Sequence, residues 1–247
     1  MGNSSWTRIH LGMCNVYGTN EVNEGMMNFA AMRERMVREQ LEDPARSITS
    51  SCVLAAMGKV PRHEFVSQNH QDDAYGDMAL SIGQGQTISQ PFVVAYMTQH
   101  LNLQPDDNIL EIGGGCGYQA AILGEIAGTV NSLEIVESLA QQATATLERL
   151  GYQNVSIIHA DGCAGWCVAA PYDAILVACA AKAVPAALVE QLAENGRLIM
   201  PIGTRTHQEL WLLEKQNEQV EKKAILPVRF VPMTGVDTEA VYSDEID

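Results

Sequence analysis

Short apolar runs alternate with predicted helices through the second half of the chain, and this alternation limits the possible folds more than any other feature. The runs are 109–112, 130–135, 155–159, 174–178 and 197–201, and the helices between them are 118–127, 138–150 and 185–192. Glycine follows two of these helices, at Gly128 and Gly151, where it is the usual residue for a left-handed cap. Continuous apolar runs are typical of parallel strands covered on both faces. The pattern predicts an α/β fold, doubly wound around a mostly parallel sheet.

Two further strands and an N-terminal helical region complete the predicted architecture. Apolar segments at 209–213 and 228–231, joined by a polar connection, indicate an antiparallel edge and bring the expected sheet to seven strands. Residues 67–90 are polar and glycine-rich, so we expect a loop there. Upstream helices would form a cap on the sheet, and the expected ranges are 28–41, 50–57 and, begun by a proline, 91–101.

The composition excludes several classes of protein. A formal charge of -15, from 15 basic and 30 acidic residues, argues against nucleic-acid and anionic-membrane surfaces, because both need clustered lysine and arginine. With 47% hydrophobic residues, the chain has enough apolar material for a sizeable core. No run reaches the roughly 18 apolar residues of a membrane span, and the N-terminus lacks the apolar segment of a signal peptide. We therefore expect a cytoplasmic protein without nucleic-acid or membrane partners.

The six cysteines are dispersed and form no CxxC pair. Cys163 and Cys167 lie four residues apart, shortly after His159, which raises the question of a metal site. Zinc sites usually have two closely spaced ligand pairs, and the second pair is missing here. We expect no metal and interpret these thiols as small hydrophobic side chains.

A glycine-rich loop follows the first predicted strand of the alternating region. The segment 111–117 reads EIGGGCG and leads into a helix. Its spacing differs from the dinucleotide pattern GxGxxG, because Tyr118 stands where the third glycine belongs. The form E-x-G-x-G-x-G looks like the S-adenosylmethionine loop of class I methyltransferases; the alternative is a purely structural glycine turn.

Acidic residues follow the next two strands. Glu134 ends the second strand, and its acceptor-only carboxylate suits the two hydroxyls of a ribose. Asp161 and Gly162 end the third strand, where an aspartate can accept from an adenine amino group. The alternatives are a solvated glutamate and an ordinary Asp-Gly turn. Because ligands bind at the carboxyl ends of such sheets, the coincidence favours a nucleoside-containing cofactor.

Several long motifs occur in one order along 36–235. They are MVREQL, VPRHEFV, AYGDMALSIGQGQTISQP, LEIGGGCGYQAA, APYDAILV and VRFVPMTG. Together they resemble the protein-L-isoaspartate O-methyltransferase family, and GQTISQP is the most specific, because methyltransferases in general do not share it. The resemblance implies a class I methyltransferase core of Rossmann-like topology with an N-terminal helical cap.

The resemblance also implies the reaction. A methyl group would pass from S-adenosyl-L-methionine to the free carboxyl of L-isoaspartyl or D-aspartyl residues in damaged proteins, which starts their repair and leaves S-adenosyl-L-homocysteine. The expected partners are damaged proteins and peptides, and the expected state is a monomer. Two alternatives stay open: a specialised aspartyl-peptide methyltransferase of a natural-product pathway, and a cofactor-binding pseudoenzyme.

The resemblance assigns site residues as well. Ser89 would be the active-site hydroxyl, and we expect it to orient the substrate rather than act as a nucleophile, since no GxSxG surrounds it. The implied substrate residues are Asp77, Ile82, Gly83 and Ser89. The implied cofactor residues are Gln86, Thr87, Ile88, Ser89, Glu111, Gly113, Gly115, Gly117, Glu134, Asp161, Gly162 and Thr234. The loop departs from the family, which more often has Thr and Ser where this chain has Gly114 and Cys116.

The expected organisation is a single domain with two polar ends. Residues 29–235 would form the methyltransferase domain, with 29–101 as the helical cap and substrate loop and 102–235 as the cofactor-binding core. Residues 1–28 form a polar extension and 236–247 an acidic tail. The net negative charge of the protein repels a carboxylate substrate at long range. We therefore expect Arg62 or Arg229 to attract the substrate locally.

Overall fold

The computed structural model describes Met1 and residues 27–235. The predicted extension at 1–28 and the predicted acidic tail at 236–247 therefore lie outside the described residues, apart from Met1, Met27 and Asn28. Within the described part of the chain, no helix is long and apolar enough to cross a membrane.

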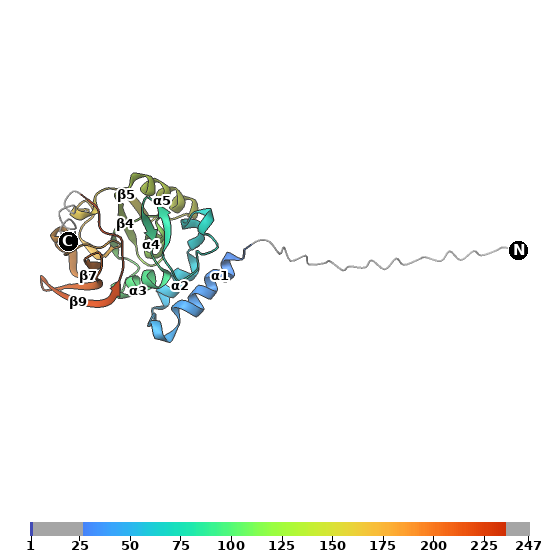
Figure 1. Cartoon of the computed structure of the whole chain (residues 1–247), viewed down its shortest axis with the longest axis horizontal. Coiled ribbons are helices and arrows are strands. Elements are labelled where there is room, and N and C mark those ends of the chain that lie inside the picture. The colour runs from blue at the N-terminus through green and yellow to red at the C-terminus, as the bar shows by residue number, and fades with distance from the viewer. Residues whose placement is uncertain (2–26, 236–247) are drawn as a thin grey trace.

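A seven-stranded sheet in the order β5-β4-β3-β6-β7-β8-β9 forms the centre of the protein (Figure 1). The first five strands in this order, β5, β4, β3, β6 and β7, run parallel to one another. Strand β8 pairs antiparallel with β7, and β9 pairs antiparallel with β8. This confirms the predicted doubly wound sheet and its antiparallel edge. Within this sheet the chain forms β3 first, continues outward through β4 to β5, and then returns to form β6 on the other side of β3. Ligands bind at such a reversal. The strands are β3 Asn108–Ile112, β4 Thr129–Glu134, β5 Val155–His159, β6 Tyr172–Val177, β7 Leu192–Gly203, β8 Gln208–Gln216 and β9 Gln219–Val228.

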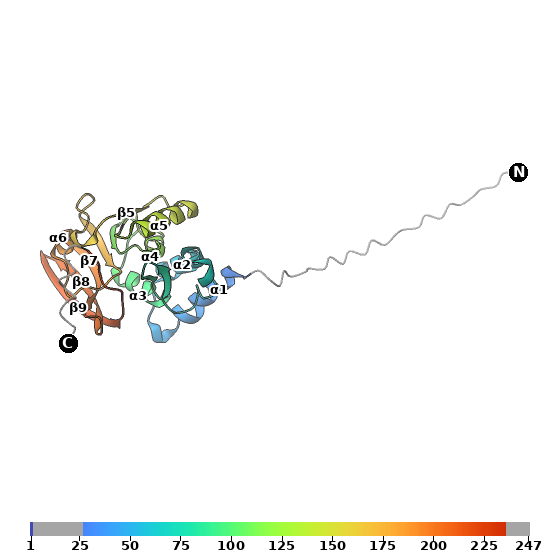
Figure 2. The same cartoon turned by 45° about the horizontal axis from the view of Figure 1, so that its top comes forward.

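Helices cover both faces of the sheet, because alternate side chains of the buried strands point to opposite faces. Ile109 and Leu176 pack with residues of α3 and α4 on one face, and Leu110 and Ile175 pack with Leu188 of α6 on the other. Helices α1 and α2 lie on the side of the molecule away from β7–β9 in both views (Figure 1 and Figure 2). The helices are α1 Phe29–Met36, α2 Ser51–Lys59, α3 Pro91–Leu101, α4 Tyr118–Gly124, α5 Glu137–Leu150 and α6 Ala186–Glu190.

The expectation of a loop throughout 67–90 is wrong for its second half. Strands β1 Leu80–Gly83 and β2 Gln86–Ile88 form an antiparallel hairpin. The turn residues Gln84 and Gly85 both have positive φ, 54° and 71°, as a tight hairpin turn requires. The hairpin is short and rich in glycine and polar residues, so it lacks the apolar pattern of a strand.

The antiparallel edge also differs from its predicted boundaries. The polar stretch that we expected to connect the last two strands is itself strand, since β8 runs to Gln216 and β9 begins at Gln219. The predicted strand 228–231 lies almost wholly beyond β9, which ends at Val228. Six of the ten β9 residues are exposed. An antiparallel strand at the edge of a sheet tolerates such residues, because one of its faces can contact solvent. The other boundaries shift by a few residues; for example, α2 continues through Gly58 to Lys59.

Candidate functional site

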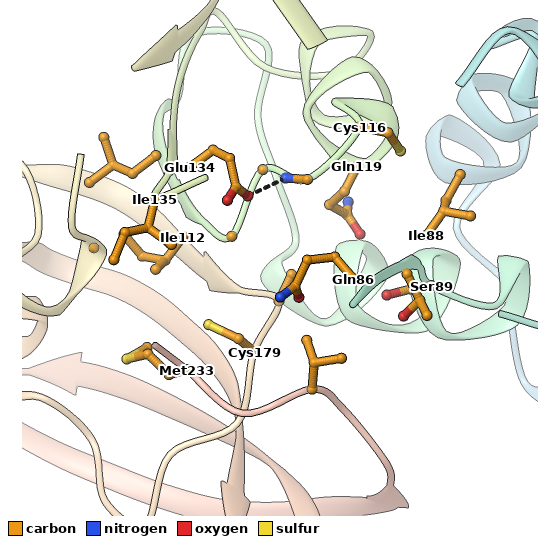
Figure 3. A pocket seen from close by; sticks show the side chains of 18 of the residues that line it. Gln86, Ile88, Ser89, Ile112, Cys116, Gln119, Glu134, Ile135, Cys179 and Met233 are labelled. Atoms are coloured by element: carbon orange, nitrogen blue, oxygen red, sulfur yellow. Dashed lines mark hydrogen bonds between the residues drawn. The ribbon is translucent and has the colours of Figure 1, made fainter. Parts of the chain in front are cut away.

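A cavity opens at the carboxyl ends of β3, β4 and β6, where the chain reverses direction (Figure 3). Its volume is about 870 Å³ with the open mouth included. The glycine loop, the end of β4, hairpin strand β2 and the segment 231–234 contribute to its wall. The predicted site residues that line it are Gln86, Thr87, Ile88, Ser89, Gly113, Gly115, Glu134, Gly162 and Thr234.

The backbone of the glycine loop explains its spacing. Gly113, Gly115 and Gly117 have φ values of 86°, 54° and 87°, in the left-handed region where other residues are strained. The amides of Gly113 and Gly114 donate to the carbonyl of Leu133 at 2.8 and 3.0 Å, which ties the loop to β4. Gly117 does not line the cavity; a Cβ there would lie 3.2 Å from Ala143 of α5, so this glycine permits close helix packing.

Glu134 connects the end of β4 to the loop. Its Oε2 accepts a hydrogen bond from the amide of Gly115 at 2.7 Å (Figure 3). Its Oε1 accepts one from the amide of Val136 at 2.8 Å. The residue is only 5% exposed, and it lines the cavity. Each carboxylate oxygen has a second lone pair, so this group can still accept the hydroxyls of a ribose.

Glu111 lies beneath the loop rather than on the cavity wall. Its side chain is fully buried, and within the described residues neither its oxygens nor the Oγ of Ser132, its partner in the β3–β4 register, has a hydrogen-bond partner. Burial raises the pKa of Glu111 to about 8, and the nearby Glu134 adds to this effect. This shift favours the neutral acid at pH 7.

Asp161 lies beside the cavity, and its neighbours Ala160 and Gly162 line the wall. Oδ1 of Asp161 accepts the amide of Cys163 at 2.9 Å and so caps the short turn that follows β5. A Cβ at Gly162 would collide with the side chain of Ile112, so only glycine lets this backbone approach the cavity. The position suits an adenine ring lying against the backbone, although the carboxylate also has the turn function that Asp-Gly pairs commonly have.

Ser89 occupies the opposite side of the cavity from Glu134 (Figure 3). It is not the N-cap of α3, which begins at Pro91 with Gln90 as its cap. The start of this helix is instead bound by Asp77, whose Oδ1 accepts the amide of Phe92 at 3.3 Å and whose Oδ2 pairs with Arg46 at 2.5 Å. The structure therefore gives Asp77 the contacts of a loop anchor, outside the cavity lining.

The two remaining substrate candidates belong to the hairpin, and neither lines the cavity. Gly83 has a φ of 88° and takes part in the hairpin turn. Ile82 packs against the glycine loop, since a Cβ at Gly115 would lie 3.2 Å from its Cδ1. Our sequence reasoning missed several apolar lining residues, although the rule about strand ends could have found those just beyond β4 and β6: Ile135, Ala178 and Cys179.

A second cavity, of about 1060 Å³ with its open mouth included, adjoins the first. It lies between the start of α3 and the segment 226–231, and it shares Thr87, Ser89, Ala178 and Val231 with the first cavity. Arg229, which is exposed, is the one charged side chain among the described residues that line it. Arg62 does not face either cavity. It is fully buried and donates to backbone carbonyls, so our expectation that it could attract substrate is wrong.

Comparisons with known proteins agree with this geometry. The family model for protein-L-isoaspartate(D-aspartate) O-methyltransferase (PCMT) matches residues 32–238. The chain is 50% identical to the protein-L-isoaspartate O-methyltransferase of Picosynechococcus sp. over 83% of its own length and 91% of the relative's. It is 52% identical to that of Opitutus terrae, over 82% and 86% of the two lengths.

Solved structures show the same fold. One protein-L-isoaspartate O-methyltransferase matches with a TM-score of 0.71 and 29% identity over 84% of this chain, which spans 65% of that longer chain. A Plasmodium falciparum chain assigned to the same activity matches with a TM-score of 0.71 and 26% identity, over 85% of this chain and 99% of the other. The latter structure is a complex with S-adenosyl-L-homocysteine.

Proposed function

The chain belongs to the protein-L-isoaspartate(D-aspartate) O-methyltransferase family, and on that premise we propose that its two adjoining cavities hold the methyl donor and the damaged peptide, with Ser89 between them. It is an S-adenosylmethionine-dependent methyltransferase that acts on isoaspartyl residues of proteins, the first step of their repair. The observation that carries the site assignment is that Ser89 and Thr87 line both cavities.

The first cavity fits S-adenosylmethionine. Glu134 would accept the ribose hydroxyls, Gly162 would face the adenine, and the amides of the glycine loop would hold the amino-acid end of the cofactor. Gly113 and Gly115 fit this role, because they line the cavity with positive φ values and without side chains. When bound, S-adenosylmethionine supplies an electrophilic methyl group whose sulfur keeps the electron pair of the broken carbon–sulfur bond.

The second cavity fits an extended peptide. Its wall combines apolar side chains, including Phe92 and Phe230, with the exposed guanidinium of Arg229. An extended segment can bind along such a groove through its backbone and alternate side chains. Arg229 would attract the substrate carboxylate locally, against the repulsion expected from a net charge of -15.

Ser89 has an orienting role in this site. The substrate carboxyl has an ordinary pKa of roughly 4, so it is already ionised at neutral pH and needs no general base. The hydroxyl of Ser89 would donate to one carboxylate oxygen and leave the other free to form the new carbon–oxygen bond. Holding the reacting atoms in line is the main contribution that this chain makes.

We further infer a monomeric cytoplasmic enzyme. Cys52, Cys116, Cys167 and Cys179 are free thiols, as is usual in a reducing compartment.

Mass spectrometry of a synthetic isoaspartyl peptide tests the proposed reaction. With S-adenosylmethionine and enzyme, we expect the mass of one added methyl group, followed by loss of methanol as the ester closes to a succinimide. The family relatives do not favour a cofactor-binding pseudoenzyme, and this experiment tests that alternative too. A pseudoenzyme would give no mass gain but would still bind S-adenosylhomocysteine in calorimetry.

A further inference from the structure

Arg62 is a fully buried arginine that none of the steps above uses. It begins the short 3-10 helix Arg62–Phe65, just after α2. A guanidinium taken out of water is costly unless its donors are satisfied. Its Nη1 has no hydrogen-bond partner within the described residues, so the burial is only partly compensated. The partners of Nε and Nη2 show what the fold gains by burying this charge.

The partners are backbone carbonyls of the segment that forms the substrate side of the site. Nε donates to the carbonyl of Ala74 at 2.8 Å. Nη2 donates to the carbonyl of Ser89 at 2.7 Å and, more weakly, to that of Met78 at 3.5 Å. Met78 precedes the β1–β2 hairpin and Ser89 follows it. One nitrogen thus holds the two ends of the hairpin together at its base.

The face of the guanidinium contacts the cofactor side of the site. Its Cζ lies 4.8 Å from the centroid of the Tyr118 ring, within the range of a cation–π interaction. Tyr118 is buried, follows Gly117 directly, begins α4 and lines the first cavity. Arg62 therefore contacts both the segment that contains Ser89 and the helix that continues the glycine loop.

We propose that Arg62 is a positioning residue for methyl transfer, which fixes the Ser89 backbone relative to the glycine loop. The proposal rests on the proposed function for its consequence, because Ser89 must orient a carboxylate toward a donor held by that loop. A displacement of about 1 Å at a reacting centre can reduce a rate about 100-fold. Arg62 itself touches neither ligand site and acts through Ser89 and Tyr118.

Two substitutions separate positioning from stability. Arg62→Lys keeps the charge but loses the planar fork of donors. Arg62→Gln keeps a planar donor group and removes the buried charge. Arg197→Lys is the matched control, because Arg197 also donates to a backbone carbonyl, that of Leu101, and lines neither cavity. For each folded variant we would measure kcat and KM for an isoaspartyl peptide, the Kd of S-adenosylhomocysteine, and hydrogen exchange across residues 80–89.

In both Arg62 variants we expect kcat to fall about 10- to 100-fold, with faster exchange in the hairpin. The Kd of S-adenosylhomocysteine should change less than kcat, since Arg62 reaches the first cavity only through Ser89 and Tyr118. The control should keep wild-type kcat. The proposal is overturned if the variants keep wild-type kcat, if the loss equals the loss of folded protein, or if hairpin exchange is unchanged. If wild-type enzyme fails to methylate the peptide, the proposed function fails, and the exchange measurement still tests whether Arg62 fixes the hairpin.

Discussion

The amide of Gly115 donates a 2.7 Å hydrogen bond to Oε2 of Glu134, so the carboxylate proposed to bind the cofactor ribose also holds the glycine loop. Glu134→Gln replaces one acceptor oxygen with a donor NH₂ group, which must then face either the amide of Gly115 or that of Val136. Loss of a hydrogen bond to a charged group costs about 1.5–3 kcal/mol. We therefore expect S-adenosylhomocysteine to bind about 10- to 100-fold more weakly, measured by calorimetry. Unchanged affinity would contradict the role given to Glu134.

Gly114 is required by its neighbour on β4. A Cβ at this position would collide with Oγ of Ser132 but would lie 3.7 Å from its Cβ, an ordinary contact. Gly114→Ala should therefore reduce the free energy of unfolding by about 1–3 kcal/mol, the usual cost of overpacking. Ser132→Ala in the same chain should restore most of the loss. Denaturant unfolding of the two single variants and the double variant measures the coupling, and simple additivity would contradict the predicted collision.

Glu111 gives the stability of the protein a dependence on pH. An unfolded glutamate ionises near 4.5, whereas the folded pKa of Glu111 is about 8, so unfolding releases a proton between these values. The stability contribution of this group is therefore fully present below pH 4.5 and is lost as pH rises toward 8. Glu111→Gln removes the titration, so the variant should gain stability relative to wild type by about 1.4 kcal/mol per pH unit within this window.

Unfolding at several pH values between 5 and 8 checks the prediction for Glu111. The matched control is Glu190→Gln, an exposed position on α6, which should track wild type at every pH. A constant difference between Glu111→Gln and wild type across the range would show that Glu111 is ionised in the folded protein.

Ser89→Ala tests the orienting hydroxyl. Loss of one donor to a carboxylate costs about 1.5–3 kcal/mol, so kcat/KM for an isoaspartyl peptide should fall about 10- to 100-fold. The affinity for S-adenosylhomocysteine should change much less. Ser81→Ala is the control on the same hairpin, because Ser81 lies on β1 outside both cavity linings. Full turnover by Ser89→Ala would remove the assignment.

Arg229→Gln tests the local attraction of substrate. Because Arg229 is exposed at the second cavity, its effect should be modest and screened by salt. We expect KM to rise about two- to fivefold at low ionic strength, with kcat unchanged, and the difference should shrink as salt is added. Lys222→Gln, an exposed cation on β9 away from the cavity, should not change KM. A salt-independent increase in KM would indicate a packing role for Arg229 instead.

Local patterns predicted the parts of the fold and site that depend on local chemistry. Three glycines with positive φ account for the loop spacing, and the rule about strand ends placed Glu134 on the cavity wall. The predicted helix 91–101 matches α3 to the residue, because Pro91 marks its start and Asn102 has the left-handed conformation that ends it. Each of these features is decided within a few residues of the chain.

The features that were missed depend on distant segments. Arg62 resembles a surface cation in the sequence, and only the tertiary structure shows that carbonyls 12 to 27 residues away surround it. Strand β9 carries Glu221, Lys222 and Lys223 and becomes a strand only because it pairs with β8. For Asp77 the sequence left a loop anchor and a pocket residue open, and only the structure shows its contacts with Arg46 and the start of α3.

The central claim is that the second cavity presents an isoaspartyl carboxylate to the methyl donor. Two peptides of one sequence, with isoaspartate or normal aspartate at the same position, test it most directly with tritiated S-adenosylmethionine. We expect kcat/KM for the isoaspartyl peptide to exceed that for the aspartyl peptide by at least about 100-fold, a difference of about 2.7 kcal/mol in transition-state binding. Equal rates, or a preference for normal aspartate, would contradict the account and favour a specialised aspartyl-peptide methyltransferase.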